Sequence, residues 1–91
     1  MKKIDKEEGI ILALVERFER FRLPRLMDIK GKVDQGGKLD ETDIEYLEKV
    51  MDDAAQNKHL YDDYPEWQKF YTGTVSLYEQ ITEKALQNEQ H

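Results

Sequence analysis

The sequence predicts an all-α protein, a small helical bundle of three long helices with the first kinked or broken at Pro24. Apolar residues recur at three- and four-residue spacings along most of the chain, whereas alternation with a period of two is nearly absent. Only two prolines and five glycines interrupt this pattern in 91 residues. Because this length is about that of one small domain, we expect residues 1–91 to form a single helical domain.

The first helical stretch is expected at residues 5–22 and is followed by another at residues 24–35. Pro24 separates them because proline lacks a backbone N–H and its ring clashes with the carbonyl four residues earlier. Either one rod kinks at this point or a second segment starts there, and we expect two segments that meet at a marked angle. The second stretch stops at Gly36 and Gly37.

Start signals precede the other two helices, which we expect at residues 41–58 and 65–88. Asp40 is suited to cap the first of them, with Asp43 three residues later, and a proline opens the second. The polar tail, residues 87–91, is expected to fray. Each helix has one apolar face that should point to the core. In the helix expected at residues 41–58 the apolar positions are Ile44, Leu47, Val50, Met51, Ala54 and Ala55. In the helix expected at residues 65–88 they are Trp67, Phe70, Tyr71, Thr74, Leu77, Tyr78, Ile81 and Ala85.

The formal net charge of −6 is divided unevenly along the chain. Residues 1–38 contain ten Lys and Arg against seven Asp and Glu, a net charge of +3, while residues 39–91 contain four against thirteen, a net charge of −9. Either the basic segment packs beside the acidic one within a subunit, or each meets a different partner. Folding of so short a chain brings the two segments together, which favours the internal interpretation.

The most specific surface pattern is a line of four carboxylates, which we call the acidic ridge: Glu41, Glu45, Glu48 and Asp52. Their spacings of four, three and four residues place them within about 60° of one another around a helix. The ridge is either a solvated polar face or a binding surface for a basic partner, because carboxylates of a single helix seldom converge on one cation. Tyr71 and Tyr78 are further candidates, either as edges of the core or as part of a protein-binding surface.

The segment from Ile10 to Val15 is apolar on all sides for nearly two helical turns. A surface helix of a monomer does not need such a segment, so it predicts a homodimer formed through the first helix. The candidate interface residues are Ile10, Ile11, Leu14, Val15, Phe18 and Phe21.

Several other classes of function find little support in the sequence. The chain contains no cysteine, which favours a reducing, cytoplasmic location. The arginines of residues 17–25 scatter around their helix in an acidic chain, so we expect no nucleic-acid binding, and the longest apolar run is too short for a membrane span. His59, Asp62 and Asp63 lie close together in sequence, but a hydrolytic pair needs a nucleophile and a zinc site needs more ligands.

The sequence therefore predicts a non-catalytic, small acidic protein-interaction or regulatory module, homodimeric and without a cofactor or metal. Its partner would be another protein, bound through the acidic ridge or the tyrosine edge. The alternative is a metal- or small-ligand-binding helical protein with a site between helices, built from His59, Asp62, Asp63 and carboxylates of a second copy.

Overall fold

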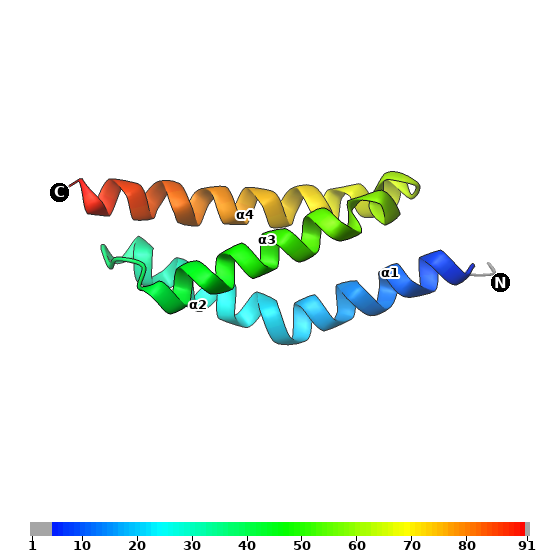
Figure 1. Ribbon diagram of the computed structural model, residues 1–91, viewed down its shortest axis with the longest axis horizontal. Helices are drawn as coiled ribbons and strands as arrows, with labels where there is room; N and C mark the ends of the chain where they lie inside the picture. Colours follow the sequence, from blue (N-terminus) through cyan, green and yellow to red (C-terminus); the bar gives the residue numbers. More distant parts are fainter. Residues whose placement is uncertain (1–4, 91) are drawn as a thin grey trace.

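A computed structural model describes residues 5–90 of the chain, and these residues confirm the predicted all-α bundle (Figure 1). The elements are α1 (Lys6–Arg17), the π-helical turn η1 (Phe18–Arg22), α2 (Leu23–Asp34), α3 (Glu41–Asp62) and α4 (Pro65–Glu89). Together α1, η1 and α2 form one long bent stretch, so the bundle has three long helical stretches as expected. The third helix is longer than expected, since it ends at Asp62 rather than near residue 58. Of the tail expected to fray, α4 includes residues up to Glu89, and His91 lies outside the described residues.

The bundle is a rod of 54 × 21 × 20 Å. In Figure 1, α3 runs antiparallel to both α4 and the α1–α2 stretch, and the start of α1 and the end of α4 lie at opposite ends of the rod. The rod can therefore be divided along its length. One half contains α2, the first half of α3 and the last half of α4, whereas the other contains α1 and the remaining halves of α3 and α4.

The bend in the first stretch comes from a π-helical turn that precedes Pro24. The Leu23 N–H donates to the carbonyl of Phe18, five residues back, and Pro24 then occupies the first turn of α2. A π-turn widens the helix, and sharp bends in helices arise at such turns and at prolines. Instead of two separate segments, the structure has one continuous helical path from α1 through η1 to α2. Figure 1 shows that this path bends between α1 and α2.

Seven buried side chains form the main hydrophobic core, in the half of the rod that contains α2. They are Leu26, Ile29 and Val33 of α2, Leu47 and Val50 of α3, and Ile81 and Ala85 of α4. The residues expected on the inner face of α4 are all buried or half-buried, which confirms that pattern. The pattern for α3 was partly wrong: Ile44 is 44% exposed and Ala55 is exposed, because Ile44 lies about 120° around the helix from Val50, outside the arc that meets α2 and α4.

A charged cluster ties the end of α2 to the start of α3; we call Arg25, Lys32, Asp40 and Asp43 the Asp43 cluster. Asp40 and Asp43 form the predicted capping box, in which the Asp43 N–H donates to Asp40 Oδ1 at 2.8 Å and the Asp40 N–H donates to Asp43 Oδ2 at 3.1 Å. Lys32 Nζ lies 2.6 Å from Asp43 Oδ2 and 3.4 Å from Asp40 Oδ2. Arg25 Nη2 lies 3.8 Å from Asp43 Oδ1, and its guanidinium also stacks over the Tyr46 ring at 5.3 Å.

These contacts make the stability of the junction depend on pH at both extremes. The hydrogen bond from the Asp43 N–H, with the nearby Lys32 charge, lowers the pKa of Asp40 below its usual value. Ionised Asp40 therefore stabilises the fold above the ordinary aspartate pKa, and this is lost as the pH falls through the lowered value. The Asp43 carboxylate raises the pKa of Lys32, so the contribution of Lys32 is lost only as the pH rises through that raised value.

Replacing Asp43 with Ala should lower the free energy of unfolding by about 1–3 kcal/mol, because the buried carboxylate receives the Asp40 N–H and faces Lys32 and Arg25. Urea unfolding followed by circular dichroism measures the change. The matched control is Glu48→Ala, an exposed acidic position in the middle of the same helix, which should stay within about 0.5 kcal/mol of the parent. Equal losses in the two variants would contradict the role given to Asp43.

Candidate functional site

The structure supports the internal interpretation of the uneven charge. Basic side chains of the first segment reach acidic ones of α3: Arg22 pairs with Asp53 at 2.5 Å, and Arg25 and Lys32 pair with Asp43. The remaining pairs that involve this segment are largely local, as between Lys30 and Asp34. On α3, the acidic side chains that meet the basic segment are therefore Asp43 and Asp53, while Lys38 pairs with Glu89 of α4.

The acidic ridge of α3 takes no part in this pairing. Its four residues, Glu41, Glu45, Glu48 and Asp52, are all exposed, and none of them joins an ion pair with another described residue. Charges of one sign are thus concentrated on one line of the surface without internal compensation. The two candidate tyrosines differ from the ridge in their setting: Tyr71 and Tyr78 are half-buried, Tyr78 against the core and Tyr71 beside the Tyr61 ring at 6.0 Å.

The candidate dimer residues are divided between the interior and the surface. Ile11 is fully buried within the chain, and Phe18 packs edge-to-face on Phe70 with ring centroids 5.1 Å apart. Leu14 and Val15 are half-buried. Ile10 and Phe21 remain at the surface, 44% and 67% exposed. The apolar segment therefore serves the fold on one side and leaves two large side chains facing solvent.

The structure does not bring the suggested histidine and aspartates together as a site. His59 is exposed, Asp62 pairs with Lys58 at 2.8 Å, and Asp63 forms the C-cap of α3. The Asp62 carboxylate raises the pKa of Lys58. Among residues 5–90, no group of three or more potential ligand side chains is placed to hold a metal ion.

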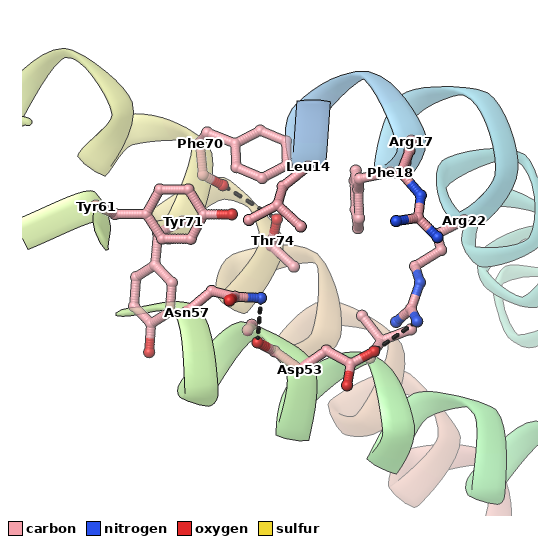
Figure 2. Close-up of a pocket in the computed structure, with 12 residues that line it drawn as sticks. Leu14, Arg17, Phe18, Arg22, Asp53, Asn57, Tyr61, Phe70, Tyr71 and Thr74 are labelled. Atoms are coloured by element: carbon pink, nitrogen blue, oxygen red, sulfur yellow. Dashed lines mark hydrogen bonds and ion pairs between the residues drawn. The ribbon is translucent and has the colours of Figure 1, made fainter. Parts of the chain in front are cut away.

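An interhelical site is nevertheless present, formed by residues that the sequence did not single out for it. A cavity of about 280 Å³ opens between α1 with η1, α3 and α4, at the place where the main core ends. Figure 2 shows two arginines on one side of it and the rings of two tyrosines and a phenylalanine on the other. Its lining consists of Leu14, Arg17, Phe18, Arg22, Val50, Asp53, Ala54, Asn57, Tyr61, Phe70, Tyr71 and Thr74.

The polar groups of this interhelical cavity are oriented by local hydrogen bonds. Asn57 Nδ2 donates to the Asp53 carbonyl at 2.9 Å, which leaves the Asn57 side-chain oxygen as an acceptor. Thr74 Oγ1 donates to the Phe70 carbonyl at 3.0 Å. Burial raises the pKa of the Tyr61 hydroxyl. The cavity thus combines fixed polar atoms with aromatic walls, as small-molecule sites do.

Sequence reasoning missed this cavity because its residues come from three helices and no single helix shows a pattern. The arginines of residues 17–25 scatter around their helix in the sequence, and this scatter does not show that Arg17 and Arg22 face the same space. A usable signal was the coincidence of small residues, Ala54 and Thr74, on the inner faces of two neighbouring helices.

Comparison with protein-family models, curated proteins and solved structures finds no match to this chain. None of the helices within residues 5–90 is both long enough and apolar enough to cross a membrane. The chemistry of the ridge and of the cavity is therefore the basis for assigning a function.

Proposed function

We propose that this protein is a non-catalytic interaction module that binds a basic segment of a partner protein through the acidic ridge. The observation that carries the proposal is the division of carboxylates on α3. Asp43 and Asp53 pair with Arg22, Arg25 and Lys32 of the basic first segment, while the four ridge carboxylates have no ion-pair partner among the described residues. Adjacent like charges on a helix cost a few tenths of a kcal/mol per pair, and a basic partner would remove that cost.

An apolar side chain beside the ridge supports a partner with an amphipathic surface. Ile44 is 44% exposed and lies about 40° around α3 from Glu48. A helix with Lys or Arg at three- and four-residue spacings could place its charges along the ridge and an apolar side chain on Ile44. The excess of negative charge would also steer a basic partner toward this face and make association sensitive to salt.

We further propose that the module is a homodimer joined through its first helical stretch. Phe21 and Ile10 support this, because they are large apolar side chains left exposed by the fold. A second copy of the chain would bury them, and closed two-fold dimers are the commonest soluble oligomers. Ile11, Leu14, Val15 and Phe18 would contribute indirectly, by fixing the helix on which the exposed pair stands.

Reversing charge on the ridge should abolish partner binding while the bundle stays folded. The test is affinity capture from the source cell with the double variant Glu45→Lys, Glu48→Lys. The amount of partner protein captured should fall by about tenfold or more relative to the parent, because like charges would now face the basic partner. The matched control is Glu79→Lys, Glu83→Lys, which makes the same charge change at two exposed positions of α4 and should retain the partner protein. Capture that is equal for the ridge variant and the parent would refute the proposal.

The dimer has its own test. Light scattering after size-exclusion chromatography at tens of micromolar should give twice the mass of the 10.8 kDa chain. Phe21→Glu should give the monomer mass with unchanged helicity. Because Phe21 is 67% exposed within one chain, a charge at this position disfavours association of two copies and leaves the fold of each copy unchanged. A monomer mass for the parent protein would rule out the dimer.

A further inference from the structure

We infer that the cavity between α1, α3 and α4 is a binding site for a small aromatic carboxylate. The inference is independent of the acidic ridge, because none of the four ridge residues lines the cavity. It rests on three properties of the cavity: an uncompensated positive charge on one side, aromatic and aliphatic walls on the other, and a free acceptor between them.

The net positive charge of the cavity lining favours an anionic ligand. Its charged lining residues are Arg17, Arg22 and Asp53. Arg22 and Asp53 form an ion pair at 2.5 Å and compensate each other. Arg17 has no ion-pair partner among the described residues, so one unit of positive charge remains at the mouth. A guanidinium presents paired N–H donors that match the two oxygens of a carboxylate, which makes this the favoured anionic group.

The aromatic side chains of the cavity lining favour a ligand with a flat apolar ring. Phe18 and Phe70 meet edge-to-face at 5.1 Å, and Tyr61 lies 5.9 Å from Phe70, so ring edges and faces already line the space. Aromatic rings prefer such edge-to-face and offset arrangements, which a planar ligand ring would extend. Figure 2 shows Tyr61, Tyr71 and Phe70 across the cavity from the two arginines, with Phe18 beside the arginines, so a ligand with a ring at one end and a carboxylate at the other would meet both sides.

Size and hydrogen bonding narrow the ligand further. The volume of about 280 Å³ lies just below that of sites for drug-sized ligands, which begin at about 300 Å³, so it suits one small ring with a short acid side chain. The Asn57 side-chain oxygen can accept a hydrogen bond, because its amide nitrogen is the atom engaged by the Asp53 carbonyl. A ring that carries a hydroxyl or N–H donor would satisfy it. A hydroxyphenyl carboxylate has all three features.

The experiment is an NMR titration of the ¹⁵N-labelled full chain with 4-hydroxyphenylacetate. Chemical-shift changes should concentrate at cavity residues of all three helices, such as Leu14, Asp53 and Thr74, with a dissociation constant on the order of 100 μM for a ligand of about eleven non-hydrogen atoms. The neutral analogue 4-hydroxyphenylacetamide has the same shape and should bind about tenfold more weakly or not at all.

Two variants separate the anion contact from the cavity itself. Arg17→Gln should weaken binding of the carboxylate about tenfold. Its control, Arg20→Gln, should bind as the parent does, because Arg20 pairs with Glu16 on the surface and does not line the cavity. Ala54→Leu should fill the space and remove binding of both compounds. The same spectra report whether each variant is folded.

Three results would overturn the inference. Equal binding of the acid and the amide would show that no anion is recognised, and unchanged binding by Arg17→Gln would remove the proposed contact. Shifts that are absent, or scattered over the surface, would identify the cavity as a gap in packing.

Discussion

The packing of α2 against α3 and α4 is the contact on which the rest of the structure depends. Val33 and Ile81 are fully buried within this interface, and burial of each such side chain contributes about 1.5–3 kcal/mol. The end of α2 is also sealed by Asn88, whose side-chain nitrogen donates to the carbonyls of Val33 and Gly37 at 2.9 and 2.8 Å. Carbonyls at a helix end need such partners, and here a side chain of α4 supplies the hydrogen-bond donor for the end of α2. With the Asp43 cluster on the other side, α2 is fixed to both neighbouring helices.

The second half of the rod is held by a different and sparser set of contacts. In α1 only Ile11 is buried, and beyond the main core the neighbouring helices meet mainly through aromatic rings. Small side chains on facing turns, Ala54 of α3 and Thr74 of α4, leave the space that becomes the cavity. The position of the cavity thus follows from the point at which large aliphatic residues give way to small and aromatic ones. The same half carries Arg17 and Arg22, so the space is charged as well as open.

Local signals in the sequence were sufficient to place the helices, apart from the end of α3 and the π-turn, but not to show how the helices meet. The capping box at Asp40 and the apolar arc of the last helix were predictable, because both depend only on residues within one helix. The π-turn was not, since Pro24 shows only that the helix must be disturbed and not which carbonyl Leu23 will bond to. Ile44 was placed wrongly because the apolar stripe of α3 is wider than the arc its neighbours cover. The ridge could be located from spacing alone, whereas the cavity needed the packing of three helices.

Native-state hydrogen exchange, measured by NMR on the Phe21→Glu variant that is expected to be monomeric, tests most directly whether α2, α3 and α4 form the stable core to which α1 is more weakly attached. The amides of α2 near Ile29 and the facing turns near Val50 and Ile81 should exchange only on global unfolding. The amides of α1 should exchange faster, through local opening that leaves the core intact, because α1 buries so little apolar surface. Protection of α1 equal to that of the core would contradict this account and would mean that all helices unfold as one unit.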